Sequence, residues 1–255
     1  MNGIERIESA LSGGAAQRRP RIVPFLTAGY PSPEAFRRLL PQIADHADVI
    51  EVGVPFSDPM ADGVTIQEAS HVALQAGTTL RGILADLADL QLQTPVLLMS
   101  YLNPLLALGP EALAREAVAA GVCGFIVPDL PYEERALLLD ALQPAGLALV
   151  QLVTPLTPAD RLAALCEASR GFVYAVTRTG TTGDGAGLPA DLSAYLDRVR
   201  AVSPCPVMAG FGIRTGAQVA ALSGHADGAI VGSALLKTVA SGGDPVRFLR
   251  ELRQP

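Results

Sequence analysis

The segment DVIEVGVPFSDPMADGVTIQ, residues 48–67, joins a short apolar run to a loop that is rich in acids. The run DVIEVGV (48–54) has the length and the β-branched content of a buried strand, yet Glu51 stands inside it. Side chains alternate along a strand, so Glu51 faces away from Ile50 and Val52. If Ile50 and Val52 contact helices, Glu51 points to the inner side of the sheet, where an unpaired carboxylate is costly.

Seven similar apolar runs recur along the 255 residues, and each is followed by a stretch with helical character. Eight strand–helix units in about 250 residues predict a (β/α)8 barrel, the TIM barrel, as a single domain that spans residues 1–255. An open doubly wound sheet is the alternative, but the GxGxxG turn that usually follows an early strand of such a sheet is absent. The seven runs are 21–27, 95–101, 123–129, 147–153, 171–177, 206–212 and 227–233.

Helix start signals support this division of the chain. SPE (32–34) places a cap, a proline and an acid in the order in which a helix begins, and TPAD (157–160) repeats that order. GPE (109–111) opens another helix in the same way. The amino-terminal segment MNGIERIESALSGG (1–14) is charged and has apolar residues at helical spacing, so it predicts a short surface helix and not a signal peptide.

The composition argues against several classes of protein. A net charge of −6 without a basic cluster disfavours nucleic-acid binding, and no apolar run approaches the ~18 residues of a membrane helix. The three cysteines are far apart and form no CxxC pair, which fits a reducing cytoplasm and suggests neither a disulfide framework nor a zinc site. The three histidines, His46, His71 and His225, are isolated from one another, so we expect no metal site.

Two connections are longer than a barrel needs, and both follow strands. Residues 54–64 come after the second predicted strand, and RTGTTGDGAGLPA (178–190) comes after the sixth. Barrels place their chemistry in the loops at the carboxyl ends of the strands. The second loop is rich in Gly and Thr, and we expect it to act as a lid that is ordered when ligand arrives.

Glycine-rich turns follow the last three predicted strands. They are GTTG (180–183), GFG (210–212) and VGSA (231–234), and Ser233 adds a hydroxyl. Glycine lets backbone N–H groups approach an anion, and the amino terminus of a helix adds partial positive charge. Ordinary turns are the alternative for any one of them, but three such turns in these places predict a phosphate site.

The acids are the candidates for chemistry. Burial should raise the pKa of Glu51 and suit it to proton transfer near neutral pH, although a carboxylate fixed in a polar layer of the barrel is the alternative. Asp62 is either a second site acid or a turn residue before a glycine. Asp129, which ends the fourth run, is a further site or loop acid. The only lysine, Lys237, falls inside the helix expected after the eighth strand, a poor place for a Schiff base.

Seven motifs resemble, in chain order, those of the tryptophan synthase α subunit family. The resemblance extends from about residue 20 to residue 237, and its second motif is long and specific. It implies a (β/α)8 barrel that cleaves indole-3-glycerol phosphate to indole and glyceraldehyde 3-phosphate, a carbon–carbon lyase reaction without Schiff base or metal. The motifs are PFLTAGYP, EVGVPFSDPMADGVTIQ, LLMSYLNP, IVPDLP, RTGTTG, AGFGI and VGSAL.

The resemblance also implies roles for individual residues. Glu51 matches the family's catalytic glutamate and Asp62 its catalytic aspartate, while Thr182 matches the lid threonine that meets that aspartate on closure. The residues that it assigns to the indole pocket and the phosphate site are Phe25, Tyr101, Tyr174, Thr182, Gly183, Phe211, Gly212, Gly232 and Ser233.

A partner is implied as well. The loop PFSDP (55–59) matches the loop with which the family contacts a β subunit, and we assign Asp58 to communication with that subunit. The partner would carry pyridoxal phosphate, receive the indole and form an α2β2 heterotetramer, whereas this chain would hold no cofactor. The implied interface residues are Pro55, Asp58, Pro59, Asn103 and Pro131.

Two other functions remain open on the sequence. One is a free-standing indole-3-glycerol phosphate lyase on the same fold, which would need a lid that closes unaided. The other is a barrel that binds a phosphorylated ligand without catalysis, although the pair of acids argues against it.

Overall fold

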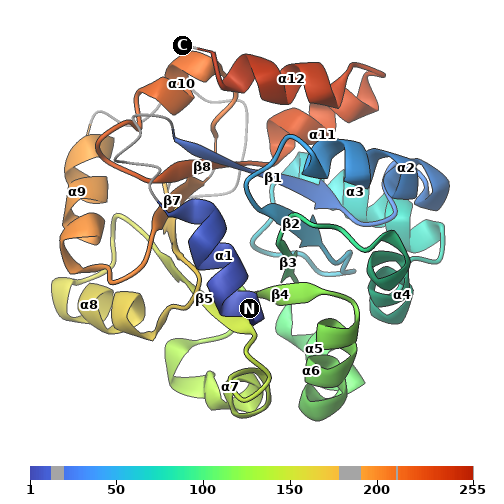
Figure 1. Cartoon of the computed structure of the whole chain (residues 1–255), viewed down its shortest axis with the longest axis horizontal. Coiled ribbons are helices and arrows are strands. Elements are labelled where there is room, and N and C mark those ends of the chain that lie inside the picture. The colour runs from blue at the N-terminus through green and yellow to red at the C-terminus, as the bar shows by residue number, and fades with distance from the viewer. Residues whose placement is uncertain (13–19, 178–190, 211, 255) are drawn as a thin grey trace.

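The computed structural model describes residues 1–12, 20–177, 191–210 and 212–254. Eight parallel strands form a closed barrel in which each strand hydrogen-bonds to the next along the chain and the last returns to the first (Figure 1). Every strand overlaps the apolar run that predicted it, so the (β/α)8 barrel is confirmed. The strands are β1 (Arg21–Thr27), β2 (Ile50–Gly53), β3 (Val96–Met99), β4 (Val122–Ile126), β5 (Ala148–Val153), β6 (Val173–Val176), β7 (Val207–Gly210) and β8 (Gly228–Val231).

Helices surround the barrel (Figure 1). Within the described part of the chain, no helix is long and apolar enough to cross a membrane. The helices are α1 (Gly3–Leu11), α2 (Pro33–Ala44), α3 (Val64–Gln75), α4 (Leu80–Leu90), α5 (Leu102–Leu108), α6 (Pro110–Ala119), η1 (Tyr132–Glu134, a 3-10 turn), α7 (Ala136–Leu142), α8 (Ala159–Ala168), α9 (Leu192–Val202), α10 (Gly216–Ala220), α11 (Ser233–Ala240) and α12 (Pro245–Leu252).

Two of the three helix start signals are confirmed. The Ser32 hydroxyl caps α2 by accepting a hydrogen bond from a backbone N–H, and α6 begins at Pro110. The third was wrong in detail, because α8 begins at Ala159 without a side-chain cap. The Thr157 hydroxyl instead accepts a hydrogen bond from the Thr154 N–H at 2.9 Å, so it closes the turn before the helix.

The buried apolar residues form two clusters, one on each side of the barrel wall. The outer cluster lies between strands and helices and includes Ile50 and Val52, whereas the inner cluster fills the barrel and includes Val49 and Leu97. Adjacent residues of one strand thus belong to different clusters, as the alternation of a strand buried on both faces requires.

The helix α1 covers the end of the barrel at which the strands begin (Figure 1). The Ile4 N–H donates to the Gly146 carbonyl just before β5, at 3.2 Å, and Gly3 lies against the Cys123 backbone in β4. Ile7 and Leu11 are fully buried in the inner cluster. The predicted surface helix is therefore present, and its apolar side chains close the end of the barrel at which the strands begin.

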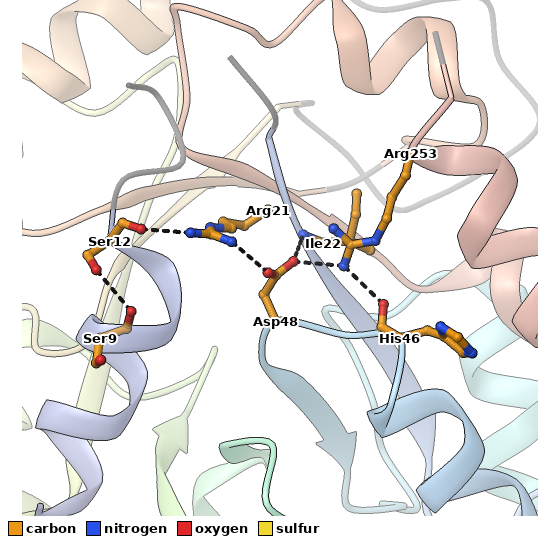
Figure 2. Close-up of polar contacts among 7 residues, drawn as sticks. All are labelled: Ser9, Ser12, Arg21, Ile22, His46, Asp48 and Arg253. Carbon is orange, nitrogen blue, oxygen red and sulfur yellow. Dashed lines mark hydrogen bonds and ion pairs between the residues drawn. The ribbon is translucent and has the colours of Figure 1, made fainter. Parts of the chain in front are cut away.

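A polar network joins the two ends of the chain at the same end of the barrel (Figure 2). Asp48 accepts hydrogen bonds from the Ile22 N–H at 2.8 Å, from Arg21 at 3.1 Å and from Arg253 at 2.8 Å. Arg21 also donates to the Ser12 carbonyl after α1, at 2.8 Å. The carboxylate of Asp48 thus connects the first strand, the second strand and the segment after the last helix.

Candidate active site

Glu51 lies on the inner face of β2. It pairs in register with Phe25 of β1 and Leu97 of β3, two members of the inner cluster, and its side chain is 1% exposed. One of its carboxyl oxygens, Oε2, has no hydrogen-bond partner among the described residues. The sequence prediction that this acid points into the barrel is therefore confirmed.

Burial sets the protonation of Glu51. Loss of solvation, with a smaller contribution from the charge of Asp62, raises the pKa of Glu51 from 4.5 to about 8. At neutral pH this carboxyl group is therefore protonated and able to donate a proton. No ion pair with Glu51 is found among the described residues, so its charge is not balanced there by an arginine, lysine or histidine.

Asp62 occupies the long connection between β2 and α3. Its N–H donates to the Pro59 carbonyl at 3.1 Å, and its own carbonyl accepts from the Gln67 amide at 2.9 Å, so the backbone is fixed on both sides. The side chain is 7% exposed, and burial raises its pKa from 3.8 to about 6, against the lowering effect of a hydrogen bond from Tyr101. At neutral pH Asp62 is thus mostly ionised while Glu51 is protonated.

Tyr101 holds the loop that carries Asp62. Its hydroxyl accepts a hydrogen bond from the Ala61 N–H at 2.8 Å and also bonds the Asp62 carboxyl group. Phe56, at the other end of the loop, stacks on the Tyr101 ring with the centroids 5.1 Å apart. Phe56 and the loop-fixing Gln67 both lie in the segment 48–67, but no sequence pattern pointed to a role for either of them.

Two aromatic rings find space inside the barrel because glycines face them. A side chain at Gly53 would meet the Phe25 ring at 2.4 Å, and one at Gly210 would meet the Tyr174 ring at the same distance. Both rings are 4% exposed, and Tyr174 is close enough to Glu51 for that charge to raise the pKa of its phenol further. The structure thus brings Phe25, Tyr174 and Glu51 together.

The predicted phosphate residues lie only partly in the described chain. Gly232 occupies the cap position of α11, Ser233 is the first residue of that helix, and a side chain at position 232 would meet the Phe25 side chain at 3.4 Å. Gly212 adopts the left-handed conformation with φ of 87°. Thr182, Gly183, Phe211 and the predicted lid 178–190 lie outside the described residues.

The predicted interface residues differ in exposure. Asp58, Asn103 and Pro131 are exposed, Pro59 is half-buried, and Pro55 is buried at the end of β2. A cleft of about 470 Å³ beside the loop is lined by Phe56, Ser57, Asp58, Pro59, Met60, Gln67, His71 and Leu74.

Two further candidates from the sequence have other surroundings. The Asp129 carboxylate accepts a hydrogen bond from the Leu102 N–H at 2.9 Å and so caps the start of α5, which gives it a structural role. Lys237 lies on α11, the helix after β8, as predicted, and it is exposed. Among the described residues, no group of three or more His, Cys, Asp or Glu side chains could hold a metal ion.

Fold and site together define a (β/α)8-barrel protein with two buried carboxyl groups whose pKa values are raised by burial, that of Glu51 more than that of Asp62. The chain matches the family described as tryptophan synthase alpha chain over residues 11–251. It belongs to that family.

Relatives and solved structures of this family match the chain over almost its whole length. The tryptophan synthase alpha chain of Desulfovibrio desulfuricans is 43% identical over 248 residues, which cover 95% of this chain and 97% of that one. That of Nitratidesulfovibrio vulgaris strain DP4 is 44% identical, with 96% of each chain covered. A tryptophan synthase structure from Mycobacterium tuberculosis superposes with a TM-score of 0.87 at 38% identity, covering 97% of this chain and 95% of that chain.

Proposed function

We propose that this chain cleaves indole-3-glycerol phosphate to indole and glyceraldehyde 3-phosphate, as a lyase of the tryptophan synthase class. The observation that carries this proposal is the pair of buried acids, with the pKa of Glu51 near 8 and that of Asp62 near 6. Burial raises both pKa values, but that of Glu51 more, and two groups whose pKa values differ in this way can act as proton donor and ionised partner in one reaction.

The proposed sequence of proton transfers follows from these two states. Protonated Glu51 gives its proton to indole C3, and the negative charge of Asp62 stabilises the positive charge that then develops on the ring N–H. Glu51, now ionised, takes the proton of the hydroxyl on the neighbouring chain carbon. The bond between indole C3 and that carbon breaks, its electron pair restores the indole ring, and the chain carbon becomes the aldehyde of glyceraldehyde 3-phosphate.

The remaining residues bind and orient the substrate in this proposal. Phe25, Tyr101 and Tyr174 flank the indole ring, since they are buried around the two acids. Gly212, Gly232 and Ser233 bind the phosphate at the amino terminus of α11, where backbone N–H groups and the helix dipole favour an anion.

The partner in this proposal is a β subunit that carries pyridoxal phosphate, in an α2β2 heterotetramer, while this chain itself holds no cofactor. The exposed positions Asp58, Asn103 and Pro131 follow β2, β3 and β4 at the same end of the barrel, which supports one continuous interface there. We place the protein in the cytoplasm, because its three cysteines are free of disulfides.

Indole release from indole-3-glycerol phosphate by the purified chain tests the proposal. We expect slow release by the chain alone and faster release when a tryptophan synthase β subunit is added. Equal rates with and without that subunit would instead identify a free-standing lyase. Substrate binding without any indole in either condition would show a binding barrel and reject the lyase.

A further inference from the structure

Thr27 carries a buried hydroxyl that nothing in the described chain satisfies. It is the last residue of β1 and is 1% exposed, and its Oγ1 has no hydrogen-bond partner. Leaving a buried hydroxyl unpaired destabilises the fold, because the group loses its hydrogen bonds to water without gaining others. Only four buried side-chain polar atoms in the described residues are in this state, and Glu51 Oε2 is another of them.

The direction of the Thr27 side chain follows from its neighbours in the strand. Leu26 and Ala28 belong to the outer apolar cluster, whereas Phe25 belongs to the inner one. Alternation therefore places the Thr27 side chain on the inner face with Phe25.

The register places Thr27 beside the proposed proton donor. Phe25 pairs with Glu51 and Thr27 pairs with Gly53, so Thr27 and Glu51 are diagonal neighbours on adjacent strands. Diagonal side chains on one face of adjacent strands lie within reach of one bound group, and here the Phe25 ring, which lies over Gly53, borders the space between them. The two unpaired polar atoms thus face the same part of the barrel interior.

The order of the strands indicates which part of the substrate lies there. β1 stands between β2, which carries Glu51, and β8, which leads to Gly232 and Ser233. In the proposed function, the indole ring lies by the acids and the phosphate lies at the start of α11. The three-carbon chain that joins ring and phosphate therefore crosses β1, and this chain carries hydroxyl groups.

We propose that the Thr27 hydroxyl hydrogen-bonds a hydroxyl on the glycerol chain of the substrate and fixes that chain for proton transfer to Glu51. This inference rests on the proposed function and adds a substrate-contacting residue to it. It also accounts for the retention of an unpaired polar atom in an apolar interior, where valine would fill the same space.

The test combines two variants of Thr27 with two ligands. The variant Thr27→Val removes the hydroxyl and keeps the shape, while Thr27→Ser keeps the hydroxyl. The first ligand is indole-3-glycerol phosphate, held without turnover in the background of Glu51→Gln, and the second is an indole joined to phosphate by a propyl chain without hydroxyls. We expect Thr27→Val to weaken binding of the first ligand about 10-fold and to leave binding of the second unchanged.

Kinetics and stability give independent readouts. In the otherwise unaltered chain, Thr27→Val should lower kcat/KM about 10-fold, and Thr27→Ser should restore most of it. Thr27→Val should not lower Tm, because the hydroxyl that it removes has no partner. The matched control is Thr177→Val at the end of the β6 region, whose buried hydroxyl donates to the Gly210 carbonyl at 2.9 Å, and this variant should lower Tm.

Equal effects of Thr27→Val on the two ligands, or no effect on either, would overturn the inference. A fall in Tm equal to that of Thr177→Val would assign the Thr27 hydroxyl to the fold and also overturn it. Absence of indole release by the unaltered chain would reject the proposed function itself, whereas the Thr27 inference depends on the difference between variants, so the two can fail separately.

Discussion

Asp48 and Glu51 stand three residues apart in the sequence and have opposite surroundings. Asp48 lies where the strands begin, partly in contact with solvent, and accepts hydrogen bonds from two arginines and a backbone N–H. Glu51 lies inside the barrel with an unpaired oxygen and a pKa raised to about 8. The two acids show how one short segment serves both the fold and the proposed chemistry.

The surroundings of Asp48 and of Glu51 have opposite effects on the stability of the fold. The donors around Asp48 stabilise its charge and hold the end of the chain against the barrel, so the network contributes to folding. Burial of Glu51, with one oxygen unpaired, lowers stability when the group is ionised, because the ionised form is disfavoured inside the barrel. We infer that the beginning of the barrel is built for stability and its interior for reactivity.

The largest expected effect comes from replacing the carboxyl group of the interior acid, Glu51, by an amide. Glu51→Gln should lower the rate of indole release about 10²-fold or more, because an acid–base group is lost while the shape is kept. Equilibrium binding of indole-3-glycerol phosphate should stay within a few-fold, since the phosphate contacts are untouched. Full turnover in this variant would remove Glu51 from the mechanism.

The same variant has a pH-dependent effect on stability. Glu51 titrates near pH 8 in the folded chain and near its ordinary 4.5 when unfolded, so the folded state holds the extra proton between these values. Stability therefore falls as the pH rises from about 4.5 to 8, and the full loss, on the order of a few kcal/mol, is present above pH 8. Urea unfolding should show Glu51→Gln to be more stable than the unaltered chain at pH 8 and equal to it at pH 4.

Removal of the other acid should affect stability and not catalysis. Asp48→Ala leaves the Ile22 N–H without its acceptor and removes the only carboxylate that Arg21 and Arg253 contact among the described residues, and we expect about 2 kcal/mol lower unfolding free energy. The control Asp45→Ala alters an exposed acid nearby and should change stability by less than about 0.5 kcal/mol. A loss of kcat at unchanged stability would contradict the assignment of Asp48 to stability and of Glu51 to the reaction.

A smaller effect is expected at the residue that tunes the second acid. Tyr101→Phe keeps the stacking on Phe56 but removes the hydrogen bonds to Asp62 and the Ala61 N–H. Because the bond from Tyr101 lowers the pKa of Asp62, its loss should raise that pKa above about 6. The acidic limb of the pH–rate profile should move to higher pH, with kcat reduced several-fold at neutral pH. An unchanged profile would show that Asp62 is not ionised in the reaction.

The smallest effect on the isolated chain should come from the exposed acid of the same loop. Asp58→Ala alters a surface residue whose side chain contacts only the neighbouring Ser57 hydroxyl among its described hydrogen bonds. We expect unchanged Tm and unchanged indole release by the chain alone, but weaker activation by the β subunit. Full activation of this variant would remove Asp58 from the proposed interface.

Several elements followed from the sequence because their causes are local. Eight apolar runs between helical stretches predicted the barrel, since strands buried on both faces need apolar residues throughout. Alternation along one strand was enough to place Glu51 inside. A cap and a proline located the start of α2 at Pro33, while the same pattern misplaced the start of α8.

Other features were decided only when distant segments met. No local pattern predicts the three hydrogen-bond donors to Asp48 or the bond from the Asp62 loop to Tyr101. Nor does any local pattern predict that the Thr27 hydroxyl lacks a hydrogen-bond partner. These facts depend on the register between strands and on closure of the barrel, which fix both hydrogen-bond partners and loss of solvation. The sequence by itself thus predicted that the acid at position 51 points inward, is buried and has a raised pKa, and the tertiary structure decided that one of its oxygens has no partner and that Asp62 lies close enough to raise the pKa further.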